Sequence, residues 1–522
     1  MIPVLMYGQD HSNSWRERYF TGTPLIIKTN IQFVFDDYIV EDKYGLKREI
    51  GPVEKYAENP LKIDTGKPWE LNSTSWSGTI LRHILFDPTE KLYKGWYLTY
   101  RREPGIETGY NYSTLYAESK DGIHWVKPEL NFFPYKGLKT NIVLHKDDGT
   151  ALLEDIYLDT LSGNSSQRYV ALVKMTPPGD SIRCLVRMFS PDGKRWSLAP
   201  EPVLFRGASD GSYSIVYNPD KAIWMLYRRP PTQALANNKD DGFYMDRNTK
   251  RRFSLAISKD MKQWTYPRNI VVLDELDDLP ITQVGNNMDI DWATVTRYQG
   301  IYFGFLHLMD NLTISVPRRN HLMWSRDGFD WDRLSQRPCF IKNGEPGEWD
   351  AGSIGSISVI PVGQQIKIYY SGGNTPQGFY GREEETDIPR FSGTGLAFIG
   401  KDRFIGLQAG PEGGFLLTRQ FILEGNRIGI NFRSALQNPP PVLGSQIRAE
   451  LLQPAVDQTA ALPYPGFSMN DCDPITVNES FHQTISWKGK SDLSELKGKP
   501  VYIRFYLRNT TLYTFQVADR QN

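Results

Sequence analysis

One short motif recurs five times along the chain at a nearly constant spacing. The motif is Ser-x-Asp-Gly-x-x-Trp, with Met261 replacing Gly in the third copy and a decayed fifth copy. Its aspartates are Asp121, Asp192, Asp260, Asp327 and Asp402, so the intervals are 71, 68, 67 and 75 residues. Such a period indicates one structural unit repeated five times, each burying its apolar face against its neighbours.

Each repeat contains four runs that are typical of β-strands. In the first repeat they are 79–86, 92–100, 113–119 and 124–127, and in the third they are 213–217, 222–228, 253–258 and 263–266. Asp-Gly between two apolar runs is a strong hairpin signal, because Gly adopts a positive φ without a Cβ clash. Four strands per repeat are typical of propeller blades. The sequence therefore predicts an all-β fold with a five-bladed β-propeller.

The pattern changes after residue 412. The segments 413–419, 427–432, 446–452 and 501–507 have the length and alternation of strands in a β-sandwich. We therefore expect two domains, a five-bladed propeller at 1–412 with an N-terminal extension at 1–70, and a C-terminal β-sandwich at 413–522.

Composition narrows the classes of partner. Sixty Lys and Arg balance 60 Asp and Glu, which removes the positive charge that most nucleic-acid binders need. No segment approaches the length of a membrane span, so we expect a soluble chain. The compartment stays open between the cytoplasm and, if a signal peptide was removed, the periplasm or exterior. Aromatic residues make up 13%, which suits pockets that stack against sugar rings.

Several segments resemble bacterial proteins related to glycoside hydrolase family 32. They are Phe33–Tyr38, Asn59-Pro60, Pro68–Glu70, Gly466–Asp473 and Ser486–Lys490, together with the repeated turns. The resemblance implies a five-bladed propeller followed by a β-sandwich, as in the invertase and arabinanase families. The W-M-N-D-P-N-G, R-D-P and E-C motifs of invertases are absent from this sequence. Catalytic residues are therefore predicted from position in the fold.

Candidate acids lie near the start of the first strand of each repeat, since these starts meet at one mouth of a propeller. Hydrolysis of a glycoside needs two carboxylates, one acting as an acid and one as a base or nucleophile. The acids near these starts include Glu154 and Asp289. We predict that the catalytic carboxylates come from Asp155, Asp210, Asp291 and Glu348, with Asp210 and Asp291 preferred for their polar neighbours.

Cationic and aromatic residues beside these acids are candidates for substrate binding, because Arg binds hydroxyls or carboxylates and aromatic rings stack on sugars. The predicted substrate-binding residues are Trp76, Arg82, His83, Arg101, Arg228, Asp289, His307, Trp349 and Asp350. If the substrate contains uronic acids, Arg101, Arg183 and Arg228 are the expected readers. No cofactor or metal motif is present, although a channel cation such as Ca²⁺ needs no linear signature.

The favoured function is an exo-acting glycoside hydrolase of poly- or oligosaccharides. Two alternatives stay open, a sialidase-like glycosidase and a non-catalytic carbohydrate-binding propeller. The aspartates of the repeated turns are interpreted as structural, and the acid run Asp274–Asp278 as a solvated loop. The sequence does not indicate the oligomeric state, the sugar or the stereochemistry.

Overall fold

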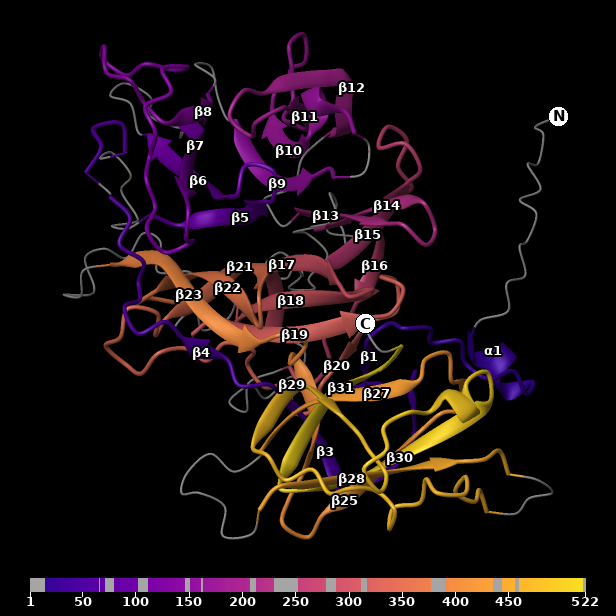
Figure 1. The fold of residues 1–522 in the computed structure, drawn as a ribbon. Helices are drawn as coiled ribbons and strands as arrows, with labels where there is room; N and C mark the ends of the chain where they lie inside the picture. The colour runs from indigo at the N-terminus through magenta and orange to yellow at the C-terminus, as the bar shows by residue number, and fades with distance from the viewer. Residues whose placement is uncertain are drawn as a thin grey trace, which may run out of the picture. The chain divides into compact units, whose positions relative to one another are not determined.

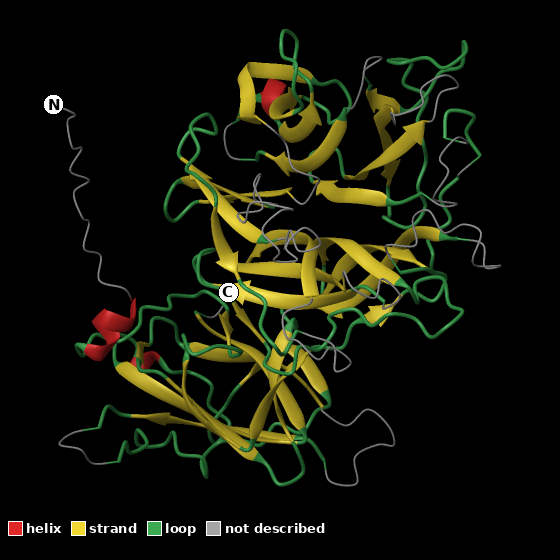
Figure 2. Cartoon of the chain, turned by 180° about the vertical axis from the view of Figure 1, so that it is seen from behind, coloured by secondary structure: helices red, strands yellow, loops and turns green. Residues whose placement is uncertain are grey.

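The computed structural model describes residues 15–64, 66–70, 79–101, 111–145, 151–160, 163–206, 213–229, 252–277, 288–310, 317–376, 390–434, 444–455 and 460–519. Almost all regular structure there is β (Figures 1 and 2). The one α-helix among these residues is α1 (Trp15–Phe20), and short 3₁₀ turns lie at Ser165–Gln167 and Ser494–Leu496. None of the helices in the described ranges could cross a bilayer. The chain is therefore all-β, as expected.

Two compact units divide the chain: Met1–Pro52 with Gly400–Asn522, and Val53–Ile399. This differs from the expected division at residue 412, because the N-terminal segment contributes strands to the C-terminal sheets. β1 (Gln32–Phe33) pairs with β31 (Thr510–Ala518), β2 (Val40–Tyr44) with β25 (Gly414–Thr418), and β3 (Leu46–Ile50) with β24 (Ile405–Ala409).

The unit formed by the two ends of the chain contains two antiparallel sheets around one core. One sheet has the order β29-β27-β31-β24-β3 and the other β2-β25-β30-β26, with β28 also paired to β30. The core includes Ile430 and Phe515 of the first sheet and Leu416 and Phe505 of the second. The remaining strands are β26 (Phe421–Ile422), β27 (Arg427–Ser434), β28 (Gln446–Leu452), β29 (Glu479–Thr484) and β30 (Pro500–Arg508).

The unit 53–399 contains five four-stranded antiparallel sheets, here numbered one to five in chain order (Figure 1). Sheet one has β5 (Leu81–Asp87), β6 (Leu92–Arg101), β7 (Asn111–Ser119) and β8 (Ile142–Leu144). Sheet two has β9 (Leu152–Leu158), β10 (Tyr169–Met175), β11 (Cys184–Ser190) and β12 (Ser197–Arg206). Sheet three has β13 (Tyr213–Asn218), β14 (Ile223–Arg228), β15 (Phe253–Ser258) and β16 (Arg268–Val271).

Sheet four has β17 (Met288–Tyr298), β18 (Ile301–Asp310), β19 (Arg319–Ser325) and β20 (Asp332–Arg333). Sheet five has β21 (Ser353–Val362), β22 (Gln365–Gly373), β23 (Ser392–Gly400) and β4 (Glu54–Lys55). The fourth strand of sheet five thus comes from before sheet one, since Lys55 pairs with Ala397. This pairing covers an edge of β23 that would otherwise be open.

The first strands of the five sheets contact one another in sequence. β5 contacts β9, β9 contacts β13, β13 contacts β17, β17 contacts β21, and β21 contacts β5. Every first strand therefore lies between two others, and the starts of the five strands can contribute to one site.

The repeated motif forms the turn between the third and fourth strands of sheets one to four. In sheet two, Ser190 Oγ accepts a bond of 2.8 Å from the N–H of Gly193, and Asp192 Oδ1 accepts bonds from two later N–H groups. The Gly193 carbonyl accepts a bond of 2.9 Å from Trp96 Nε1 in sheet one. Equivalent bonds join Tyr227 to Gly328 and Tyr369 to Gly122. Each of these three turns is therefore bonded to the neighbouring sheet.

Two of the expected fourth strands lie later in the chain than predicted. The run 124–127 makes only an isolated bridge, Glu118 to Val126, and the fourth strand of sheet one is β8. The run 263–266 similarly precedes β16. The reason in sheet one is that Trp125 packs against Tyr369 of sheet five, with ring centroids 6.1 Å apart, which draws the segment away from its own sheet.

Candidate functional site

Three first strands contain a β-bulge close to their starts, and the extra residue is charged in each. In β5 the pairing passes from Leu81 to His83 while β6 advances by one residue, which leaves Arg82 as the extra residue. The same shift leaves Glu154 as the extra residue of β9 and Asp291 as the extra residue of β17. A bulge redirects side chains relative to the regular alternation of a strand, and bulges are common beside active sites.

The other two first strands differ from this pattern. β21 has a register shift between Gly355 and Ser358, where Ser356 adopts a φ of 42°. β13 pairs regularly with β14 over its whole length. The charged bulges are therefore a property of sheets one, two and four.

Arg82 connects the bulges of three sheets. Its Nη2 lies 4.0 Å from Glu154 Oε2, and its guanidinium carbon lies 4.4 Å from the ring centroid of Trp292, the residue after Asp291. Glu154 also forms an ion pair of 3.0 Å with Lys174 on β10. Since β5, β9 and β17 belong to different sheets, these contacts bring three strand starts together.

Asp291 is held by a separate arginine. Its carboxylate lies 2.9 Å from Arg318 Nη2, and its carbonyl accepts a bond of 2.9 Å from Arg229 Nη2. The N–H of Arg318 donates to the Gly352 carbonyl, just before β21. We call Arg82, Glu154, Lys174, Asp291, Trp292 and Arg318 the strand-start cluster.

The electrostatics of Glu154 favour its ionised form. Burial raises the pKa of this carboxyl, but Lys174 and Arg82 more than offset burial and hold the pKa below its ordinary value. Glu154 is therefore a carboxylate at neutral pH. It can stabilise positive charge or act as a base or nucleophile, but it has no proton to give.

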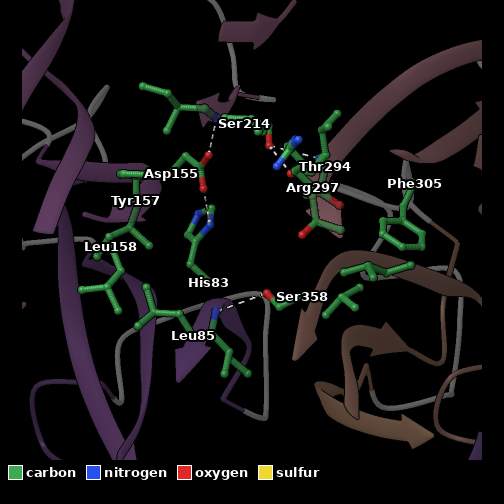
Figure 3. A pocket seen from close by; sticks show the side chains of 18 of the residues that line it. His83, Leu85, Asp155, Tyr157, Leu158, Ser214, Thr294, Arg297, Phe305 and Ser358 are labelled. Atoms are coloured by element: carbon green, nitrogen blue, oxygen red, sulfur yellow. Dashed lines mark hydrogen bonds and ion pairs between the residues drawn. The ribbon is translucent and has the colours of Figure 1, made fainter. Parts of the chain in front are cut away.

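A cavity of about 420 Å³ is lined by residues of all five first strands (Figure 3). His83 and Asp155 face each other in this cavity, with His83 Nδ1 3.4 Å from Asp155 Oδ1. Asp155 Oδ2 also accepts a bond of 2.6 Å from the N–H of Ile215. Ser358 Oγ accepts a bond of 3.2 Å from the N–H of Ile84. The predicted residues Arg82, His83 and Asp155 are thus brought together.

Asp289, His307 and Arg228 are all completely buried. The Nδ1 of His307 lies 3.2 Å from the Ile354 carbonyl oxygen. Burial, reinforced by the nearby Arg318 charge, lowers the pKa of His307 to about 3, so this imidazole is neutral at physiological pH. Neutral His307 lies directly opposite Trp292 in the β17–β18 pairing, next to the bulge.

Glu348, Trp349 and Asp350 form a network before β21. Asp350 is buried, 2.6 Å from Lys55 Nζ, and accepts a bond of 3.0 Å from the Tyr370 hydroxyl. Trp349 stacks on Tyr370 at 5.8 Å, and exposed Glu348 accepts a bond from the N–H of Glu345 in its own turn. The contacts of Asp350 join β4, which completes sheet five, to the loop before its first strand.

Three of the predicted site residues are only partly accessible to description or not at all. Trp76 and Asp210 lie outside the described residues. Arg101 is the last residue of β6, and only its backbone is described.

Sequence reasoning did not select Lys174 and Arg318, the cations that pair with the two bulge carboxylates, and it preferred Asp155 to the adjacent Glu154. Lys174 lies in an otherwise apolar strand, Tyr-Val-Ala-Leu-Val-Lys-Met, and this isolated charge was the available signal. Arg318 precedes β19 with no pattern that distinguishes it from other surface arginines.

The acid run 274–278 is not a solvated loop in its described part. Asp277 is completely buried and receives two bonds from Arg333, of 2.5 and 2.8 Å. Arg337 Nε lies 3.3 Å away. The interpretation was wrong because the arginines that pair with Asp277 are more than 50 residues later in the chain.

Within the described ranges, no group of three or more His, Cys, Asp or Glu side chains is placed to hold a metal ion.

Comparisons with known proteins return structural similarities only. No protein-family model matches the chain, and no curated protein matches it. A glycosyl hydrolase from Bacteroides ovatus has a TM-score of 0.41 and 13% identity over 68% of this chain and 95% of its own. A fructofuranosidase from Schwanniomyces occidentalis has a TM-score of 0.39 and 10% identity over 88% and 99%.

An N-acetylgalactosamine deacetylase from F. plautii is also similar, with a TM-score of 0.37 and 14% identity over 72% of this chain and 96% of its own. At such TM-scores and identities, these similarities establish neither the fold nor the activity of this chain.

Proposed function

We propose that the unit 53–399 is a five-bladed β-propeller and that the unit built from the two ends of the chain is a β-sandwich. The proposal is supported by the five four-stranded sheets, by the contacts between successive first strands, and by the cavity that all five of these strands line. In a propeller, the strand β4 closes the last blade from the N-terminal side.

On this fold we propose a glycoside hydrolase that acts on oligo- or polysaccharides at the strand-start cluster. The observation that carries the proposal is the pair of charged bulges, Glu154 and Asp291, whose strands both reach Arg82. Buried carboxylates on opposite sides of a shared mouth supply the groups that glycosidic cleavage needs. Trp292 adds an aromatic face of the kind on which sugar rings stack.

The roles follow from charge. Glu154 and Asp291 are each paired with a cation, which suits them to stabilise the oxocarbenium-like transition state or to activate water or attack the sugar. The proton for the leaving oxygen then comes from a third carboxyl group, for which Asp210 and Glu348 are the candidates. Asp155, bonded to His83, positions that imidazole at the cavity.

The test is an activity screen of the purified chain on aryl-glycosides and oligosaccharides, followed by Glu154→Gln and Asp291→Asn on any substrate that is cleaved. Each variant should lower turnover by roughly 10²–10⁴-fold, the usual effect of removing a catalytic carboxylate. The matched control is Asp330→Asn, an exposed aspartate on the turn of sheet four, which should keep wild-type turnover.

Both variants also remove one member of a buried ion pair, so their folded fraction has to be measured by circular dichroism before rates are compared. Normal turnover by both folded variants would contradict the assignment. Sugar binding without any cleavage would instead favour the carbohydrate-binding alternative.

A further inference from the structure

Arg228, at the end of β14, is a completely buried cation with unsatisfied donors. Its Nε donates to the Arg229 carbonyl at 3.1 Å. Within the described residues, its Nη1 and Nη2 have no hydrogen-bond partner. A guanidinium has five N–H donors, four of them on these two nitrogens, so most of its donors are left unused.

Two aromatic rings compensate only part of this burial. The guanidinium carbon lies 4.2 Å from the ring centroid of Phe205 and 5.3 Å from that of Tyr213. Such rings attract the positive charge but do not replace in-plane acceptors for its N–H groups. Burial lowers the pKa of Arg228, which is another expression of the missing anion.

The neighbouring charges do not supply that anion. Arg229 donates to the carbonyl of Asp291, which places Arg228 next to the strand-start cluster. The buried carboxylate of Asp289 acts on Arg252, where it partly offsets the effect of burial on the pKa of that arginine. In sheet two, by contrast, buried Glu154 has Lys174 as a partner. Sheet three therefore presents a buried cation without a described counter-charge.

We propose that Arg228 binds the carboxylate of an acidic sugar unit in the substrate, which makes the substrate class uronic-acid-containing saccharides. The two free ends of the guanidinium form a planar fork that matches the two oxygens of a carboxylate. Removal from water strengthens this pairing, because a partner for a buried cation is worth more than a partner for an exposed one. The inference rests on the proposed function and identifies the substrate class of the same site.

The experiment measures binding, so it does not depend on cleavage. The full chain is titrated with sodium D-galacturonate and D-glucuronate, each compared with its neutral parent sugar and with sodium sulfate, by ligand-observed NMR. Wild type should bind at least one uronate about tenfold or more tightly than its parent sugar, since a charge-assisted bidentate contact is lost in the neutral sugar.

Arg228→Met should abolish this preference, and Arg228→Lys, which keeps the charge without the fork, should retain a weaker one. The matched control is Arg206→Met on β12, because the Arg206 side chain is 67% exposed and pairs with Asp180. It should leave the preference unchanged. The unliganded Arg228→Met protein should melt at or above the wild-type temperature, because it loses an unpaired buried charge.

Three results would overturn the proposal. One is equal binding of uronate and parent sugar by wild type, and another is binding of sulfate alone. The third is a lower melting temperature for both Arg228→Met and Asp210→Asn, which would show that the partner of Arg228 is a carboxylate of this chain. A uronate preference without hydrolysis would retain this inference and reject the proposed hydrolase, and hydrolysis of neutral sugars alone would do the reverse.

Discussion

The two ends of the first four sheets in the unit 53–399 use carboxylates in opposite ways. At the turn end, Asp192 accepts bonds from the N–H groups of Lys194 and Arg195 in its own loop. At the strand starts, Glu154 and Asp291 pair with Lys174 and Arg318, which come from other strands. A turn aspartate can be replaced in any sheet by the same local device, whereas a strand-start carboxylate depends on the arrangement of several sheets.

This difference predicts where stability and activity separate. Although partial burial works in the other direction, the backbone N–H groups of Arg195 and Lys194 lower the pKa of Asp192, so it stays ionised as a turn-forming group. The strand-start carboxylates are desolvated and lie next to a cavity. Substitutions at the turns should therefore change the free energy of unfolding, and substitutions at the bulges should change turnover.

The largest effect on stability is expected for Trp125→Ala at the turn end of sheet one. Trp125 is buried and packs against Tyr369 of sheet five. Removing a large buried aromatic should lower the free energy of unfolding by about 3–5 kcal/mol, measured by urea denaturation. Turnover per folded molecule should remain at the wild-type level. Loss of turnover without loss of stability would break the separation.

Much of the repeat could be predicted from the sequence because the turn is a local structure. Ser190, Asp192 and Gly193 make their bonds within four residues, so the motif itself contains the geometry. The strands β25, β27, β28 and β30 follow the expected runs for a similar reason, since period-two alternation is also local.

The bulges could not be predicted, because a bulge is defined by the register of a partner strand. Nothing in the letters around Glu154 indicates that β10 skips it, and its pairing with Lys174 joins residues 20 positions apart. The contact of Arg82 with Trp292 joins two sheets more than 200 residues apart. The same distance in sequence concealed the ion pairs of Asp277.

A second, smaller effect on stability is expected from acid. The pKa values of buried His307 and His321 are both lowered from 6.5 to about 3, mainly by burial. The unfolded chain binds protons on these histidines below pH 6.5, and the folded chain does not do so until about pH 3. Stability is therefore fully present above pH 6.5 and falls as the pH decreases toward 3.

The slope should reach about 1.4 kcal/mol per pH unit for each histidine. Urea denaturation at pH 7, 6, 5 and 4 measures it, and His307→Gln should reduce the slope by the share of one histidine. An unchanged slope in this variant would mean that His307 is not a buried neutral group.

The smallest effect is expected for Asp192→Asn at the turn of sheet two. The amide oxygen can still accept from the N–H groups of Lys194 and Arg195, so the loss is that of charge assistance, about 1 kcal/mol in the free energy of unfolding. Thermal melting monitored by circular dichroism is sensitive enough to detect it. A loss above about 3 kcal/mol would show that the turn aspartate does more than bond its own loop.

The most direct test of the separation between the two ends is the turnover of Asp291→Glu compared with that of Asp192→Glu. Both variants keep the negative charge, so the pair with Arg318 and the turn of sheet two can both persist. The extra methylene moves the carboxylate by roughly 1 Å, which at a reacting centre costs about 10²-fold in rate. The account predicts that loss for Asp291→Glu and wild-type turnover for Asp192→Glu. Equal turnover in the two variants would contradict it.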